Sequence, residues 1–209
     1  MGTIPQSKIS LVKKLYYDKG YGMQDVANYL NVSINAVEYF MKHNDIKRRG
    51  YSDANKMSFS HKPLSFNLKK KLTLKEQKLK LMGIMAYWCE GSKSTHHNNC
   101  RVDFANCDPQ MMKIFILFLR KICGIDETRL RMSIYGYSNQ DINKITKYWS
   151  RLLKVPCSKF IKPYVRTDFD ISKKDRMPYG LAHIRYHDKK LLILIKNWIE
   201  DIKNKIDKK

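Results

Sequence analysis

The sequence predicts an α+β fold in which an all-helical N-terminal domain precedes a larger α/β domain. Residues 7–50 carry short stretches of helical periodicity that end at turn residues. Residues 51–72 are polar and basic without sustained periodicity, so we expect a linker there. From residue 73 onward, strand-like and helix-like segments alternate. We therefore expect a helical domain over 1–50, a basic linker over 51–72 and an α/β domain over 73–209.

The charge balance points to a polyanionic partner. The chain contains 41 Lys and Arg residues against 19 Asp and Glu, a formal net charge of +22. Such an excess causes self-repulsion that a polyanion relieves, usually nucleic acid and less commonly an anionic membrane surface. No apolar run is long enough to span a bilayer, and the N-terminus lacks a signal-peptide core. We expect a cytoplasmic, nucleoid-associated protein without a membrane partner.

The N-terminal domain is predicted to contain short helices in the segments ISLVKKLYYDKG, MQDVANYL and INAVEYFMKHN. The first is expected to end at Gly20, and Ser33 is placed as the N-cap of the third. The side chains expected to face the core are Ile9, Val12, Leu15, Val26, Ala27, Leu30, Ile34, Val37 and either Phe40 or Met41. Two short helices joined by a tight turn form a helix-turn-helix arrangement.

Residues 8–49 resemble the helix-turn-helix domains of resolvases and many repressors. The resemblance is carried by MQDVANYLNVSINAVEYFMK and the basic IKRR that follows. It implies that the third helix enters a DNA major groove. The side chains that would face bases and phosphates are Asn35, Glu38, Tyr39 and Lys42. Lys47, Arg48 and Arg49 would neutralise phosphates or reach into the minor groove. A small helical bundle used for protein contacts is the alternative interpretation.

The α/β domain is predicted to begin with a helix over 74–90. Thr73 and Glu76 have the spacing of a capping box at its start. The segment LMGIMAYWCEG is apolar almost all round, so this helix should be packed on more than one side. Gly83 and Ala86 permit another backbone to come close. A second copy of the same helix, crossing at a two-fold axis, would cover it.

Further strands are predicted in CRVDFANCD, RLRMSIYGY, SKFIKPYV and YGLAHIRYH, and further helices in PQMMKIFILFLRKICGI, QDINKITKYWSRLL and DKKLLILIKNWIEDIKNKI. In the first of these strands, Val102 and Phe104 should lie on one face and Arg101 and Asp103 on the other. Asp103 is either a second acid of a site or a cross-strand partner of an arginine, and we favour the partner.

The segment GIMAYWCEGS has an apolar helix that closes on an acid, a glycine and a serine, and VDFANCDPQMMKIFILFLRKICGI runs from a strand into a long helix. In these features residues 74–205 resemble the LAGLIDADG family of homing endonucleases. The resemblance implies a saddle-shaped sheet over duplex DNA and a homodimer through helix 74–90. It also implies that Glu90 of each copy binds Mg²⁺ (or Mn²⁺) between the scissile phosphates. The helix at 140–153 departs from the usual family pattern.

Glu90 is the predicted catalytic and metal-binding residue. The macrodipole disfavours an acid at a helix C-terminus by about 0.3–1 kcal/mol, and a carboxylate is a suitable ligand for Mg²⁺. A solvated glutamate at a helix end is the alternative. Lys162 is the first candidate for a catalytic cation and Arg185 the second; each is otherwise a phosphate contact or a surface charge. The DNA contacts expected in this domain are Lys93, Arg101, Arg129, Arg131 and Arg185, with His183 on the same sheet face.

The cysteines do not indicate a structural metal. They number five, lie in apolar or mixed segments and are expected to be free thiols in a reducing compartment. His96, His97, Cys100 and Cys107 lack the paired spacing of a zinc site, so we expect no zinc.

The sequence therefore predicts a sequence-specific double-stranded DNA-binding protein. We expect a metal-dependent, homing-type endonuclease that cleaves DNA phosphodiester bonds as a homodimer. The alternative is a non-catalytic DNA-binding transcriptional regulator that keeps the same fold.

Overall fold

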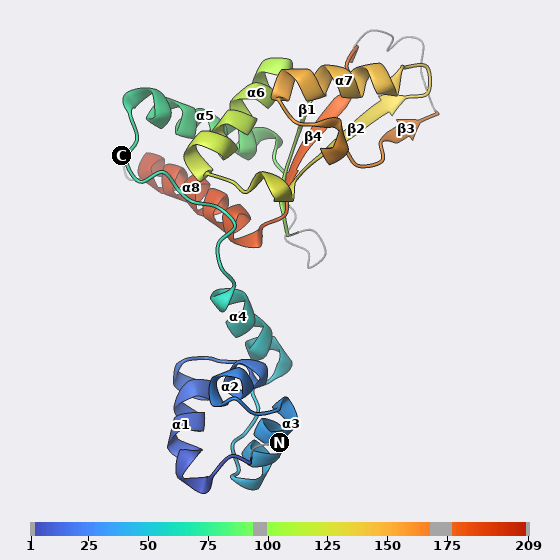
Figure 1. Ribbon diagram of the computed structural model, residues 1–209. Helices are drawn as coiled ribbons and strands as arrows, with labels where there is room; N and C mark the ends of the chain where they lie inside the picture. The colour runs from blue at the N-terminus through green and yellow to red at the C-terminus, as the bar shows by residue number, and fades with distance from the viewer. Residues whose placement is uncertain (1–2, 94–99, 168–176, 208–209) are drawn as a thin grey trace. The chain divides into compact units, whose positions relative to one another are not determined.

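The computed structural model describes residues 3–93, 100–167 and 177–207, and the chain forms two compact units, Met1–Pro63 and Leu64–Lys209 (Figure 1). The first unit is helical and the second combines helices with a sheet, so the predicted mixture of α and β structure is confirmed. Within the described ranges, no helix combines the length and apolar character that crossing a lipid bilayer requires.

Residues 51–72, expected to form a linker, divide between the two units. Helix α4 (Tyr51–His61) belongs to the first unit. The chain beyond Pro63 belongs to the second, where Phe66 is buried and pairs with Ile125 in an isolated bridge. The backbone N–H of Asn67 also donates to the carbonyl of Gly124 at 2.9 Å. The extended part of this segment is therefore held against the second unit.

The first unit contains η1 (Gln6–Lys8), α1 (Ile9–Lys13), the π-helical turn η2 (Lys14–Asp18), α2 (Met23–Leu30) and α3 (Ile34–His43). Ser33 caps α3 as predicted, because its hydroxyl accepts from the Ala36 N–H at 3.2 Å. The core of this unit consists of Val12, Leu15, Tyr16, Val26, Ala27, Val37, Phe40, Met41 and Ile46. The prediction that Ile34 is buried is wrong: as the first residue of α3 it is 38% exposed.

The second unit contains α5 (Leu74–Glu90), β1 (Val102–Asn106), α6 (Pro109–Phe118), the turns η4 (Leu119–Cys123) and η5 (Glu127–Arg129), β2 (Leu130–Tyr137), α7 (Ile142–Leu153), η6 (Cys157–Lys159), β3 (Tyr164–Arg166), β4 (Leu181–Tyr186) and α8 (Lys189–Asp207). Helix α5 begins with the predicted capping box, in which Glu76 accepts from the Thr73 N–H at 3.0 Å. Asp188 accepts from the Leu191 N–H at 3.0 Å in the first turn of α8.

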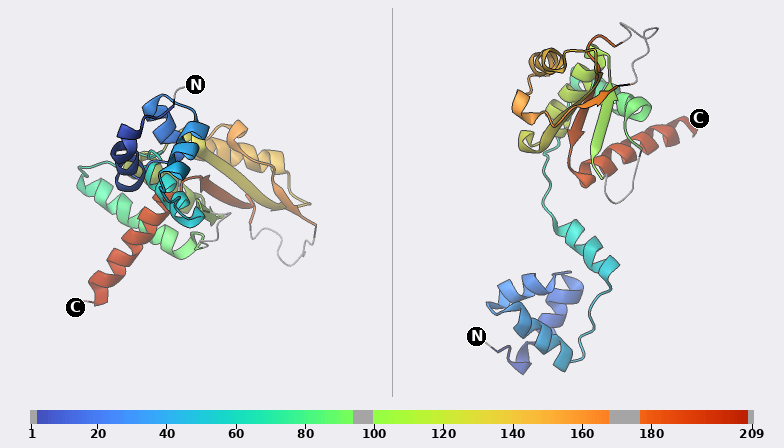
Figure 2. Two further views of the ribbon diagram at one scale, coloured as in Figure 1. Left: turned by 90° about the horizontal axis from the view of Figure 1, so that it is seen from below. Right: turned by 90° about the vertical axis from the view of Figure 1, so that its right-hand side faces the viewer.

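The strands form one sheet in the order β1-β4-β2-β3 (Figures 1 and 2). Strand β4 runs antiparallel to both β1 and β2, whereas β3 runs parallel to β2. In this register Arg185 of β4 lies between Asp103 of β1 and Arg131 of β2. Residues predicted on separate strands are therefore direct neighbours across the sheet.

Helices cover one face of this sheet. Helices α5, α6 and α8 pack against β1, and α7 packs against β2. The strand side chains on this face are apolar and buried, among them Phe104, Met132 and Ile184. They join one core cluster with apolar residues of the four helices. Because side chains alternate along a strand, the remaining strand positions share the opposite face.

Gly83 lets α5 and α6 pack closely within one chain. A Cβ atom at Gly83 would lie 2.2 Å from Cγ of Phe118, and Ala86 is also buried. This corrects the expectation that Gly83 leaves room for a second copy of α5, because Phe118 of the same chain already occupies that space.

We predict that Gly83→Ala lowers the free energy of unfolding by up to about 2 kcal/mol. Alanine favours a helix by about 1 kcal/mol, but overpacking against Phe118 costs about 1–3 kcal/mol. Urea denaturation measures the difference. Phe118→Leu in the same chain should recover part of the loss. A Gly83→Ala variant more stable than wild type would show that the helices separate without cost.

Candidate nucleic-acid interface

The sheet face opposite the helices carries charged and aromatic side chains, and we call it the polar face. Its strand positions include Asp103, Arg131, Tyr135, His183 and Arg185. They recur at every second residue of β1, β2 and β4, between the apolar positions that face the helices. The alternation predicted for β1 is confirmed, since Val102 and Phe104 are fully buried and Asp103 is not.

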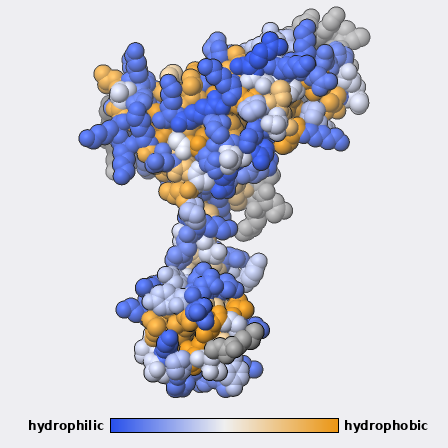
Figure 3. Space-filling model, in the orientation of Figure 1, coloured by the Kyte–Doolittle hydropathy of each residue, from blue (hydrophilic) through white to orange (hydrophobic). Residues whose placement is uncertain are grey.

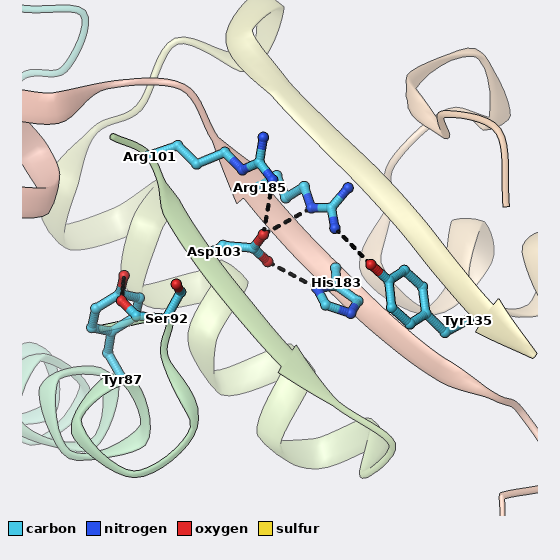
Figure 4. Close-up of polar contacts among 7 residues, drawn as sticks. All are labelled: Tyr87, Ser92, Arg101, Asp103, Tyr135, His183 and Arg185. Atoms are coloured by element: carbon cyan, nitrogen blue, oxygen red, sulfur yellow. Dashed lines mark hydrogen bonds and ion pairs between the residues drawn. The ribbon is translucent and has the colours of Figure 1, made fainter. Parts of the chain in front are cut away.

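Asp103 is the centre of a hydrogen-bonded network on the polar face (Figure 4). Arg185 Nε donates to one carboxylate oxygen at 2.9 Å, and His183 Nδ1 lies 2.9 Å from the other. Arg101 Nη2 approaches the first oxygen at 3.4 Å. The predicted role of Asp103 as a cross-strand partner of an arginine is confirmed.

The surroundings of Asp103 keep it ionised. Burial raises the pKa of its carboxyl group, but the hydrogen bond from His183 and the charge of Arg185 outweigh burial and lower the pKa overall. The carboxylate oxygens are thus already engaged by cationic or N–H groups. Asp103 therefore does not fit the role of a second metal ligand.

Four arginines surround His187, just beyond β4, and we call them the arginine cluster: Arg101, Arg129, Arg131 and Arg185. Burial lowers the pKa of His187, and the positive charges of these four side chains lower it further. Arg129 also donates to the His187 carbonyl. Among the described strand residues Asp103 is the only acid on this face, so the cluster carries an excess of positive charge. Such a local excess attracts anions.

Two buried nitrogen atoms on the polar face lack a hydrogen-bond partner, Arg101 Nε and His183 Nε2. An unsatisfied buried polar atom costs about 1–3 kcal/mol, so native proteins rarely leave one without a partner. An oxygen-bearing ligand or an ordered water at these atoms would offset the cost. The polar face therefore has the positive charge of an anion site, and Arg101 Nε adds a donor without a partner among the described residues.

The arginines differ in their exposure. The side chain of Arg185 is only 11% exposed and that of Arg101 23% exposed, whereas Arg129 is exposed. Arg131 is half-buried and donates to the carbonyls of Thr128 and Leu130, both at 2.7 Å. Arg129 and Arg131 are thus the members best placed to meet a large ligand, and Arg185 positions its neighbours.

The prediction that Arg129 lies on a strand is wrong. It ends the turn η5, where Asp126 accepts hydrogen bonds from the N–H and the hydroxyl of Thr128 at 2.9 and 2.7 Å. Arg101 likewise lies just before β1 rather than within it. Both side chains nevertheless lie close enough to His187 to influence its pKa.

Glu90 is the last residue of α5 and is exposed. It makes no ion pair with any described residue. The chain then joins the edge of β1, where Gly91 pairs with Phe104 and the Ser92 N–H donates to the Asp103 carbonyl at 2.8 Å. A Cβ atom at Gly91 would meet the Tyr87 carbonyl oxygen at 2.4 Å, so only glycine permits this turn. Glu90 is thereby placed beside the strand that carries Asp103.

Lys162 and Lys93 are both exposed. Lys162 lies between η6 and β3, not on a strand as predicted, because β3 begins only after Pro163. Lys93 follows Ser92 at the sheet edge, and its carbonyl accepts from Lys196 Nζ at 3.1 Å. No contact between described residues joins Lys162 to Glu90.

Among the described residues of one chain, Glu90 has no partners that would complete a metal site. The described residues contain no group of three or more His, Cys, Asp or Glu side chains placed to hold a metal ion. His96 and His97 lie outside the described residues. Glu90 fits the role of one carboxylate ligand, and Mg²⁺ accepts one or two carboxylates completed by waters and phosphate oxygens. The further ligands would come from DNA, solvent or a second copy.

The exposed face of α3 carries Asn35, Tyr39 and Lys42, which share one side at spacings of four and three residues. Tyr39 is 64% exposed and stacks on His43 with ring centroids 3.7 Å apart. These predicted contacts are thus brought together on one surface.

The two arginines after α3 have partners within the unit. Arg48 pairs with Glu38, which neutralises the acid on the exposed face of α3. The Arg49 guanidinium lies 4.1 Å from the ring centroid of Tyr16 and donates to the Tyr21 carbonyl. Arg49, predicted as a DNA contact, therefore holds the basic segment against the helical core. The sequence alone could not predict this role, because Tyr16 and Tyr21 lie far from Arg49 in the chain.

No disulfide links the cysteines of the described residues, as expected. Cys89, Cys107 and Cys157 are exposed thiols, whereas burial raises the pKa of the Cys123 thiol to about 12 and makes it unreactive. Comparison with protein-family models, with curated proteins and with solved structures finds no match to this chain.

We predict that Asp103→Asn lowers the free energy of unfolding by about 3 kcal/mol at neutral pH, because it leaves largely buried arginines without a counter-charge. Because the pKa of Asp103 is lowered by folding, its contribution is present above the unfolded pKa near 3.9 and fades as the pH falls below it. The difference in free energy of unfolding between wild type and Asp103→Asn should therefore become smaller at acidic pH.

Urea denaturation at several pH values measures this gap. Asp53→Asn is the matched control, because Asp53 forms only an exposed pair with Lys56 at 3.6 Å and should change stability by less than about 0.5 kcal/mol. An equal effect of the two substitutions would mean that the Asp103 network does not stabilise the sheet.

We also predict that the pKa of His187 lies below its ordinary value and rises when duplex DNA is added, because phosphates offset the arginine charges. NMR titration of the imidazole measures it. Arg131→Gln should raise the pKa in the unbound protein. An unchanged His187 pKa at saturating DNA would place the duplex away from the arginine cluster.

Proposed function

We propose that this protein is a sequence-specific double-stranded DNA-binding protein that cleaves DNA as a metal-dependent, homing-type endonuclease. The arginine cluster on the polar face carries the proposal. It gathers four positive side chains around His187, of which only Arg101 and Arg185 pair with the Asp103 carboxylate, and phosphate is the anion that such an excess of positive charge is suited to bind. In this proposal the second unit is a LAGLIDADG-like domain whose polar face lies on the duplex.

The first unit would act as a helix-turn-helix domain. Asn31, whose backbone adopts the left-handed helical conformation, ends α2, and Ser33 then caps α3. This short turn leaves Asn35, Tyr39 and Lys42 on an exposed helix face suited to a major groove. Arg48 and Glu38 neutralise each other, so recognition of the DNA sequence would depend on Asn35, Tyr39 and Lys42.

For cleavage, Glu90 would supply a carboxylate to Mg²⁺ or Mn²⁺. A bound metal ion polarises a phosphoryl oxygen and lowers the pKa of coordinated water. Arg129 and Arg131 would hold the phosphate backbone in register. Lys162 is exposed and unpaired among the described residues, which suits a cation that meets DNA only when the complex forms.

A homodimer through α5 is the proposed assembly. Helix α5 leaves apolar side chains exposed: Leu81 at 52%, Met82 at 45% and Met85 at 39%. These positions and Cys89 lie on one side of the helix, away from buried Gly83 and Ile84. A second α5 on this side would cover this apolar surface. Glu90 lies on the Gly83 side of the helix, so the two Glu90 residues would meet only if the two helices cross at their C-terminal ends.

The alternative function is a non-catalytic DNA-binding regulator. It is favoured by the close packing of Gly83 on Phe118, which uses the small residue of α5 inside one chain. It is also favoured by the engagement of Asp103, because among the described residues this leaves Glu90 as the single carboxylate proposed to bind a metal. Cleavage then depends entirely on assembly, whereas DNA binding does not.

Selection from a randomised duplex library, followed by incubation of the bound sequence with Mg²⁺ or Mn²⁺, tests both functions. We predict that wild type enriches a specific sequence and cleaves it. Glu90→Gln should retain binding but lose cleavage by about 100-fold or more, since it removes a ligand charge without changing shape.

The control measurements separate the alternatives. Arg131→Gln should weaken duplex binding and reduce its salt dependence by about one phosphate contact. Tight specific binding without cleavage by wild type would establish the regulator instead. Cleavage that persists in Glu90→Gln would remove Glu90 from the mechanism, and a monomer on DNA in analytical ultracentrifugation would remove the dimer.

A further inference from the structure

A groove of about 1100 Å³ lies beside α7, at the end of β2 and away from the arginine cluster. Its lining combines basic and aromatic side chains, chiefly Lys113, Lys144, Tyr148, Arg151, Lys154 and Tyr179. They come from α6, from α7 and its C-cap, and from the segment before β4. The function proposed above uses none of them.

The aromatic wall of this groove is held in place by hydrogen bonds. The rings of Tyr148 and Tyr179 are stacked, with centroids 3.8 Å apart and planes 6° apart. Trp149 Nε1 donates to the Tyr179 carbonyl at 2.7 Å. The Gln140 side chain donates to the Met177 carbonyl at 2.8 Å and accepts from the Tyr137 N–H at 2.9 Å. The wall is therefore formed before any ligand binds. Tyr179 remains 40% exposed.

The basic side of the groove follows from the amphipathic character of α7. Ile145, Trp149 and Leu153 face the core. Lys144 and Arg151 are exposed on another side of the helix, with Tyr148 between them in the sequence. Hydrophilic side chains cover much of the second unit in the view of Figure 3.

Among the described residues, no ion pair balances the positive charge of the groove. Lys113, Lys144, Arg151 and Lys154 form no ion pair with any described residue. The nearby acids are occupied as helix caps. Asp141 accepts from the Lys144 N–H at 3.0 Å, and Asp108 accepts from the Gln110 N–H at 2.7 Å. Four cations thus face two acids, next to an exposed aromatic ring.

We propose that this groove binds single-stranded nucleic acid. Unpaired bases would stack on the Tyr148–Tyr179 pair, and the four basic side chains would contact the phosphates. A duplex keeps its base faces stacked and has none to offer to a tyrosine wall, whereas an acidic peptide would use the charges but not the ring faces. The groove is thus a second nucleic-acid site, independent of duplex binding on the polar face.

Fluorescence anisotropy of the full chain with a fluorescein-labelled oligothymidylate of about six nucleotides tests the proposal. We predict that the double variant Lys144→Gln, Arg151→Gln weakens binding about 5-fold or more, and that Tyr179→Leu has an effect of similar size. Lys147→Gln is the matched control, because Lys147 is an exposed lysine of α7 outside the groove lining and should leave binding unchanged. Thermal unfolding monitored by circular dichroism confirms that each variant is folded.

Several outcomes would overturn the proposal: no binding of the oligothymidylate by wild type at low salt, an equal loss in Lys147→Gln, or displacement by a polyglutamate peptide at equal concentration. A loss in Arg131→Gln but not in the groove variants would place the strand on the polar face instead. The groove variants should retain duplex affinity. Failure of duplex binding with intact oligothymidylate binding would refute the proposed function alone.

Discussion

The polar face depends on the carboxylate of Asp103. It accepts from His183 and Arg185 across the β1–β4 pair, and Arg101 approaches from the start of β1. Without this negative charge, neighbouring arginines would repel one another at the middle of the sheet. The hydrogen bond from Arg185 Nε to Asp103 also fixes the Arg185 side chain, whose Nη2 lies 3.4 Å from the Tyr135 hydroxyl. One acid thereby orders side chains on three strands, yet it leaves the face positively charged.

That order extends to the end of α5. The main-chain carbonyl of Asp103 accepts from Ser92, and the Tyr87 hydroxyl donates to the Ser92 carbonyl at 3.0 Å. The turn that carries Glu90 is therefore tied to the same strand as the network (Figure 4). The proposed chemistry at Glu90 and the proposed phosphate contacts of the arginine cluster therefore share strand β1 as their support, Glu90 through the main chain of Asp103 and the cluster through its carboxylate.

The sheet also separates two surfaces of different character. The polar face combines arginines with a neutralising acid, which suits a phosphate backbone. The groove beside α7 combines lysines with stacked tyrosines, which suits exposed bases. Because Gly83 is used to pack α5 on α6, the apolar surface left for assembly is the side with Leu81 and Met85. The activities proposed for the second unit are thus distributed over distinct surfaces.

The sequence by itself determined most of the helices, most of the strands and their caps, because these depend on residues a few positions apart, as in the Thr73–Glu76 box. It did not predict α4, which lies in the segment expected to be a linker. It also indicated that Asp103 would meet an arginine, because strand alternation placed both on one face. Only the tertiary structure decided that Arg49 packs on Tyr16, and that Tyr148 stacks on Tyr179. Those partners lie far apart in the chain, and the packing of whole elements brings them together. The periodicity of the sequence does not predict that packing, because it depends only on residues a few positions apart.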